Sequence, residues 1–157
     1  MYYIIMDLTD YETDSNFEFE IEKIIQSIEL KDIRTIEEIN KLNNDILKFV
    51  YEEFLIYDTN KENLNYALNI LKDNYEYVES IDELKHKDFV MGIRLSHFYN
   101  LQLKRLGFFF SSSDNKVCLG YFRGNKFNYN FDNYVFFRKL NSLDKTKLFL
   151  IKSIENE

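Results

Sequence analysis

The chain has 157 residues, and its 27 acidic and 20 basic side chains give a net charge of −7 at neutral pH. Aromatic residues make up 17% of the chain, which argues against intrinsic disorder because disordered chains are poor in aromatics. Cys118 is the only cysteine, and no stretch approaches the roughly 18 apolar residues of a membrane span. The sequence therefore predicts a cytoplasmic protein with no disulfide, no leader peptide and no contact with a membrane.

The first 30 residues predict a strand and then a helix. Residues 2–8 form a short apolar run rich in β formers. Ser15 and Glu18 have the spacing of a capping box, in which each side chain accepts a hydrogen bond from the backbone amide of the other. Apolar side chains then recur at helical spacing from Phe17 to about Leu30.

Two further helices are expected before residue 80. Thr35 and Glu38 form a second capping box, and the apolar stripe behind it indicates a helix over about 36–57. Asn60 is placed to cap a third helix, which would run to about Tyr77. A third capping box, formed by Ser80 and Glu83, predicts one or two short turns.

The hydrophobic period changes at Phe89. Apolar and polar residues alternate from there, which predicts a strand over 89–96, while 97–106 fits either a strand or a helix that ends near Gly107. The remaining expected elements are a hairpin over 108–122 with its loop at 112–116, strands near 127–131 and 134–140, and a last helix over 143–154, of which 148–151 could also be strand.

These elements predict the α+β class, with an N-terminal strand and three or more helices packed on a C-terminal antiparallel β-meander, and a C-terminal helix. The length indicates a single domain, residues 1–157. Its helical half, 1–88, holds 22 acidic and 9 basic residues and is acidic. Its β half, 89–157, holds 5 acidic and 11 basic residues and is basic and aromatic.

The leading functional expectation is a small protein that binds and inhibits a protein partner by masking its basic surface. In profile, though in no motif, the chain resembles immunity proteins and phage-encoded inhibitors of host defence. Acidic side chains would steer the encounter, and tyrosines would anchor the interface. The expected residues are Glu37, Glu38, Asp45, Glu52 and Glu53 for steering, with Tyr51 and Tyr57 as anchors.

The alternative expectation is a nucleic-acid-binding protein that uses the basic β half. Its cations would contact phosphates, and its alternating rings would stack on bases. The residues of this alternative are Arg94, Lys104, Arg105, Arg123 and Lys126 for phosphates, with Phe127 and Tyr129 for bases. The competing interpretation of the rings is that they face the helices and form core.

Enzymatic chemistry is not expected, and the sequence indicates no cofactor and no metal site. Cys118 lies in an apolar run and is expected to be buried; His97 is expected in the core and His86 at the surface. The least favoured alternative is a magnesium-dependent nuclease, with carboxylates from Asp7 and Asp10 and the Glu83-Leu84-Lys85 triplet.

Overall fold

The computed structural model describes residues 34–155. Contacts within the chain divide it into two compact units, one of residues 39–139 and the other of residues 1–38 with 140–157. The expectation of a single domain over residues 1–157 stays a prediction. The expected strand over 2–8 and helix over 17–30 lie outside the described residues.

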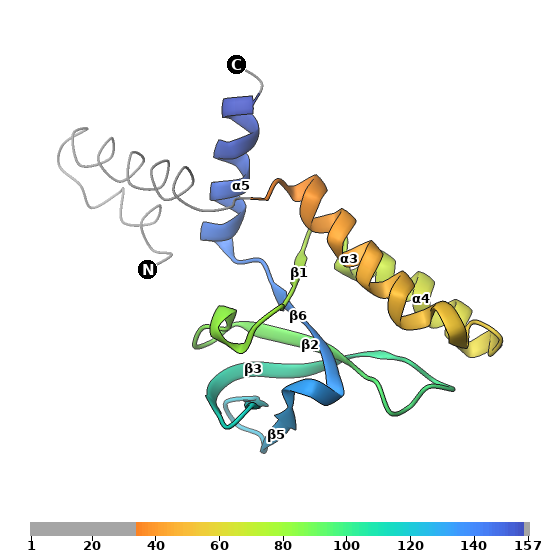
Figure 1. The fold of residues 1–157 in the computed structure, drawn as a ribbon. Coiled ribbons are helices and arrows are strands. Elements are labelled where there is room, and N and C mark those ends of the chain that lie inside the picture. Colours follow the sequence, from red (N-terminus) through yellow and green to blue (C-terminus); the bar gives the residue numbers. More distant parts are fainter. Residues whose placement is uncertain (1–33, 156–157) are drawn as a thin grey trace, which may run out of the picture. The chain divides into compact units, whose positions relative to one another are not determined.

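Helices α3 (Ile36–Tyr51) and α4 (Asp58–Leu71) lie side by side as a hairpin (Figure 1). The capping box at the start of α3 is confirmed: the Glu38 amide donates to Thr35 Oγ1 over 3.1 Å, and the Thr35 amide donates to Glu38 Oε1 over 3.4 Å. The helix ends earlier than predicted, because the chain tightens after Tyr51 into the 3₁₀ turn η2 (Glu52–Phe54).

Helix α4 corrects two expectations. Asn60 does not cap the helix, because it lies inside the first turn and is fully buried. The helix stops at Leu71 instead of Tyr77, because Asp73 takes a left-handed backbone conformation with φ 63°. Asn40 of α3 fixes this turn, since its amide group donates to Asp73 Oδ1 over 2.7 Å and accepts from the Asp73 amide over 2.9 Å.

Six antiparallel strands follow in the described part of the chain, in the spatial order β1-β6-β2-β3-β4-β5. They are β1 (Tyr75–Tyr77), β2 (Phe89–Arg94), β3 (Leu103–Ser113), β4 (Lys116–Gly120), β5 (Lys126–Asn130) and β6 (Tyr134–Lys139). The predicted strand over 89–96 is confirmed as β2, and the open stretch 97–106 is a loop as far as residue 102 and the start of β3 from Leu103 on. The predicted hairpin is also confirmed, with a tighter turn at Asp114 and Asn115, whose φ angles of 51° and 61° suit a two-residue turn.

The sheet is only partly the expected meander. Strands β2 to β5 follow one another as predicted, but β6 returns to pair with β2 and β1. Only the three-residue turn η4 (Phe131–Asn133) joins β5 to β6, which spans at most about 14 Å. A flat sheet would hold these two strands about 19 Å apart, so the sheet must curl. Gly107 allows this bend, with a φ of 119° that other residues rarely adopt.

Curling gives the sheet two cores on its two faces. Met91 of β2 belongs to the core beneath α3 and α4, and its neighbour Val90 belongs to the core inside the curl. The core under the helices includes Leu47, Tyr51, Ala67, Leu71, Ile93 and Phe137. The core inside the curl includes Phe109, Val117, Leu119 and Phe136. Alternate side chains of β2 therefore point into two different cores, rather than into one core and into solvent.

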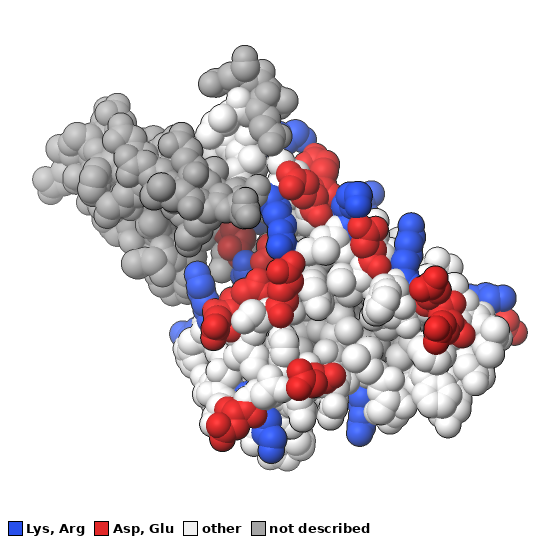
Figure 2. Space-filling model, viewed as in Figure 1, with Lys and Arg blue, Asp and Glu red and all other residues white. Residues whose placement is uncertain are grey.

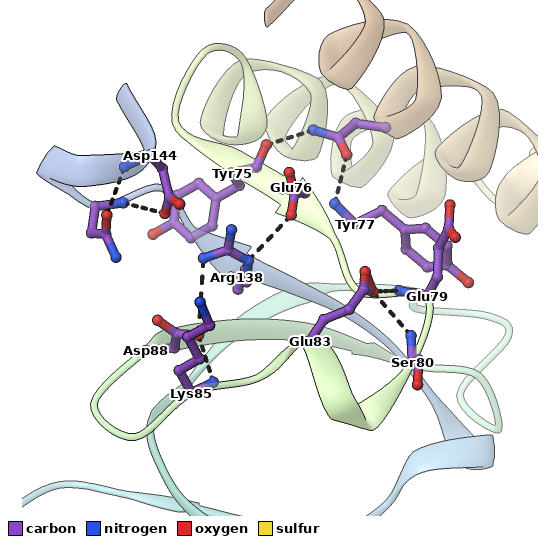
Figure 3. A network of polar contacts seen from close by, with 12 residues as sticks. Tyr75, Glu76, Tyr77, Glu79, Ser80, Glu83, Lys85, Asp88, Arg138 and Asp144 are labelled. Atoms are coloured by element: carbon purple, nitrogen blue, oxygen red, sulfur yellow. Dashed lines mark hydrogen bonds and ion pairs between the residues drawn. The ribbon is translucent and has the colours of Figure 1, made fainter. Parts of the chain in front are cut away.

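The free edge of β1 is closed by Asn43, a buried side chain of α3. Its Nδ2 donates to the Tyr75 carbonyl over 2.8 Å, and its Oδ1 accepts from the Tyr77 amide over 2.9 Å. Beside this strand, the Arg138 guanidinium lies 3.2 Å from Glu76 and 3.9 Å from Asp88 (Figure 3). At the other end of the sheet, β5 pairs with β4 along one edge, and no described residue pairs with its second edge.

In the other unit, residues Ser142–Glu155 form helix α5, which settles 148–151 as helix. Asn141, not the neighbouring Ser142, caps it: the Asp144 amide donates to Asn141 Oδ1 over 2.8 Å. No helix of the described residues is long and apolar enough to cross a membrane.

The third capping box is confirmed and surrounds the single 3₁₀ turn η3 (Ile81–Glu83). We expect Ser80→Ala to lower the free energy of unfolding by about 1 kcal/mol, because the Asp82 amide loses its side-chain acceptor. Urea titration measures this loss. Thr59→Ala, a change of similar size at an exposed position of α4, serves as the control, and equal losses in both variants would contradict the capping role.

Candidate nucleic-acid interface

A groove opens where the curled sheet leaves a gap beside β5. One hollow of about 510 Å³ is lined by β5, η4 and the ends of β2 and β6. A second, of about 210 Å³, continues toward β3 and the loop of residues 95–102. The two hollows share Arg94, Tyr129 and Tyr134, so they form one continuous surface, called here the basic aromatic groove.

Three cations line this groove at different points along it. Arg94 ends β2 and lines both hollows, Lys104 of β3 lines the smaller one and Lys116 of β4 the larger one. None of the three forms an ion pair with a carboxylate of the described residues, and the described lining contains no Asp or Glu. Asp132 of η4, beyond the end of β5, accepts a hydrogen bond from Asn115 over 2.7 Å. The groove is therefore a positive strip on a chain of net negative charge.

Three aromatic rings line the same groove. The rings of Tyr129 and Tyr134 meet edge to face at 5.2 Å, and Tyr134 stacks on the buried Phe136 at 5.4 Å. Burial, and then the neighbouring Tyr134, raises the pKa of the Tyr129 hydroxyl, so this group stays a neutral hydrogen-bond donor at physiological pH. Phe127 is 58% exposed, and its side chain is free to take a planar ligand.

Amide side chains complete the lining of the groove: Asn100, Gln102, Asn128, Asn130 and Asn133. Each offers both donors and an acceptor, the combination that reads the edges of bases. Asn100 and Gln102 belong to the loop of residues 95–102, which also presents His97.

Asn60 of α4 holds this loop in place. Its Nδ2 donates to the Phe54 and Phe98 carbonyls over 2.9 and 2.8 Å, and its Oδ1 accepts from the Leu101 amide over 2.8 Å. The Tyr51 hydroxyl donates to the Leu101 carbonyl of the same loop. One wall of the groove therefore depends on the helical hairpin.

Of the seven residues that the sequence proposed for binding nucleic acid, some line the groove and others lie outside it. It brings Arg94, Lys104, Phe127 and Tyr129 together in the groove. Arg105 and Lys126 lie instead over aromatic rings outside it, and Arg123 is exposed in a turn away from the lining. Tyr129 packs partly against the core inside the curl, on the face of the sheet away from the helices, and Phe127 is exposed, so neither ring faces the helices as the competing interpretation expected.

Sequence reasoning missed Tyr134 and placed His97 wrongly. His97 is exposed and lines the groove, because β2 ends at Arg94 and the chain turns away before the alternation reaches it. His86 is exposed as predicted. Tyr134 joins the groove through the return of β6 beside β2, where it pairs with Arg94, and a linear pattern holds no signal for that pairing.

Only some of the residues proposed from the sequence for the acidic face are exposed and could contact a partner. Tyr51 as an anchor is wrong, because the residue is fully buried and burial raises the pKa of its hydroxyl. Tyr57 is half-buried against Tyr99 at 5.8 Å. Glu37, Glu38, Asp45, Glu52 and Glu53 are exposed, although Glu38 serves the capping box and Asp45 pairs with Lys41 over 2.9 Å. On the face that Figure 2 shows, basic side chains lie between acidic ones.

Cys118, the two histidines and Glu83 are the described groups that the sequence offered for catalysis or metal binding. Cys118 is half-buried, where a buried thiol was expected, and neither histidine lines the shallow hollow beside it. Glu83 accepts the Glu79 and Ser80 amides over 2.6 and 3.0 Å. Asp7 and Asp10 lie outside the described residues. Within 34–155, no three His, Cys, Asp or Glu side chains gather where they could hold a metal ion.

Comparison with known proteins gives the groove no precedent. No family model matches the chain, and neither a curated protein nor a solved structure does.

Proposed function

We propose that this protein binds single-stranded nucleic acid in the basic aromatic groove. The observation that carries the proposal is the convergence of three cations, three rings and five amide side chains in one groove whose described lining has no carboxylate. Cations bind phosphates, rings stack on bases and amides hydrogen-bond to base edges, so each group has a role with one ligand.

A single strand suits the groove better than a duplex. Rings and amides act on bases only where these are unstacked and unpaired. Arg94 lies in both hollows, between Lys104 on one side and Lys116 on the other, so the cations follow a line that a strand backbone can track.

The direct test is fluorescence anisotropy with labelled single-stranded DNA and RNA dodecamers and the matching duplexes. With three phosphates neutralised, the plot of log affinity against log salt should have a slope of about −2 for single strands. Duplexes should bind more weakly. Absence of binding at low salt would overturn the proposal. Equal binding of a poly-glutamate peptide would assign the groove to acidic peptides instead.

Phe127→Ala separates stacking from folding. The ring is 58% exposed, so we expect unchanged thermal stability and a loss of single-strand affinity of about tenfold, the effect of one lost stacking contact. The matched control is Phe149→Ala, which removes a similarly exposed ring (68%) from α5 and should change neither property. An unchanged affinity for Phe127→Ala would exclude the ring from the binding site.

A second candidate function is inhibition of a protein partner with a basic surface, of the immunity-protein or phage anti-defence type. It is supported by Phe49 and Ile56, which are 78% and 79% exposed beside Glu52 and Glu53. Reversing both charges, in Glu52→Lys with Glu53→Lys, should release a partner that co-purifies from a related host and survives nuclease treatment. A partner that is retained would contradict this candidate.

A further inference from the structure

A second exposed aromatic surface lies outside the groove, on β2, β3 and the turn after β4. It consists of Phe89, Phe108, Phe110, Tyr121 and Phe122, called here the outer aromatic cluster. Neighbouring ring centroids lie 5.2–6.5 Å apart along the cluster. Tyr121 and Phe122 are 44% and 58% exposed and present apolar area to solvent, while Phe89, Phe108 and Phe110 are half-buried behind them.

Cations surround these rings. The Arg105 guanidinium lies 5.9 Å from the Phe89 ring centre, and the Lys126 ammonium lies 4.7 Å from that of Phe110. His86 meets Phe110 at 6.0 Å. No carboxylate of the described residues forms an ion pair with Arg105 or Lys126. The surface therefore suits a partner that carries both apolar and acidic groups.

The arrangement of the rings favours protein over nucleic acid. Three contacts are edge to face, with interplanar angles of 69°, 87° and 80°. These rings pack against one another, whereas Phe127 in the groove contacts no other ring of the described residues and keeps its faces open for a base. Aromatic rings beside arginine are instead typical of the centre of protein interfaces.

One surface with the complementary chemistry lies on the same unit of the chain. Asp45, Phe49, Glu52, Glu53 and Ile56 occur at spacings of three, four and one residues, all are exposed, and they are called here the α3 stripe. Asp45 and Phe49 lie on α3 away from its buried residues Ile39, Asn43, Leu47 and Tyr51, whereas Glu52 and Glu53 belong to η2 and Ile56 to the turn that follows. Phe49 and Ile56 are the apolar anchors of this stripe, at 78% and 79% exposed.

We propose that the protein associates head to tail, with the α3 stripe of one copy on the outer aromatic cluster of the next. Phe49 and Ile56 pack against Tyr121 and Phe122, while Glu52 and Glu53 approach Arg105 and Lys126. The proposal rests on the surface of the second candidate function and names a second copy of this chain as its occupant. Because the two surfaces differ, each copy keeps one of each free, and the contact extends as an open chain unless its rotation closes a ring.

Sedimentation velocity tests this without an unknown ligand. The weight-average mass of the wild type should rise from 19.1 kDa with concentration and fall back with salt. The stripe variant Glu52→Lys/Glu53→Lys and the cluster variant Arg105→Glu/Lys126→Glu should each stay monomeric. Their equimolar mixture should associate again and grow with concentration as chains of alternating copies, because the intact pair of surfaces and the charge-swapped pair are both compatible. All four substitutions in one chain should restore association.

The outcomes that overturn the proposal are specific. A wild type that stays monomeric at all concentrations excludes it, and a mixture that stays monomeric shows that the two surfaces do not meet. Loss of single-strand affinity in the cluster variant, with no effect on mass, would assign the cluster to nucleic acid. The stripe variant should keep the wild-type affinity for single strands. A monomeric wild type whose stripe variant still releases a co-purified partner would leave the second candidate function standing.

Discussion

Asn60→Asp is expected to lower the free energy of unfolding by about 4 kcal/mol at neutral pH. The Asn60 amide group donates to the carbonyls of Phe54 and Phe98 over 2.9 and 2.8 Å and is fully buried. A carboxylate at this position keeps the bond from the Leu101 amide but faces two carbonyl oxygens without a donor. The buried charge and the Phe98 carbonyl, which loses its donor, both contribute to the loss, whereas the Phe54 carbonyl still accepts from the Tyr57 amide over 3.2 Å.

The loss from Asn60→Asp should depend on pH. Burial and the facing carbonyls raise the folded-state pKa of the introduced carboxyl above its unfolded value of about 3.9. The folded state therefore binds a proton more tightly, and stability declines as pH rises from the unfolded pKa through the folded one. Urea titrations at pH 4 and pH 7 measure this, with the smaller loss relative to wild type at pH 4.

Asn63→Asp is the matched control for this prediction. Asn63 donates from the next turn of α4 to Asn100 of the same loop over 2.7 Å, but that bond is exposed. We expect a loss below about 1 kcal/mol for this variant. Hydrogen exchange at the Leu101 amide should accelerate in Asn60→Asp alone. Equal stability losses in the two variants would show that Asn60 does not hold the loop.

Local signals in the sequence predicted the helices well. The capping boxes at Thr35 and Ser80 formed as expected, because each depends on residues three positions apart. Asn60 shows where such reasoning ends. It has the residue type of a cap, yet its partners Phe98 and Leu101 lie 38 and 41 residues away, and those contacts decide its role.

The strands show the same division between local and distant information. Alternation and turn residues predicted β2 and the β3–β4 hairpin, since both depend on neighbours along the chain. The return of β6 to β2 depends on pairing across 40 residues or more, such as Arg94 with Tyr134, and no pattern along the chain encodes it. Because this pairing builds the groove, the sequence could propose Arg94 and Tyr129, which line the groove, but could not bring Tyr134 to them.

The final prediction concerns Arg94, the cation that lines both hollows of the groove. Arg94→Glu removes a phosphate contact and places a like charge at the centre of the strip. We expect single-strand affinity to fall about 30-fold at moderate salt, equivalent to about 2 kcal/mol. The side chain is exposed and has no ion-pair partner among the described residues, so thermal stability should stay unchanged.

Arg123→Glu is a closely matched control for Arg94→Glu. It changes the net charge equally, also on the basic half of the chain, but Arg123 lies in an exposed turn outside the groove lining. Anisotropy titrations should show a loss below about threefold, because only the long-range field changes. If both charge reversals weaken binding equally, net charge rather than the groove attracts the strand. That result would contradict the proposal that the groove binds nucleic acid. A large loss of affinity in Arg94→Glu alone would require the strand to run past Arg94 from one hollow into the other.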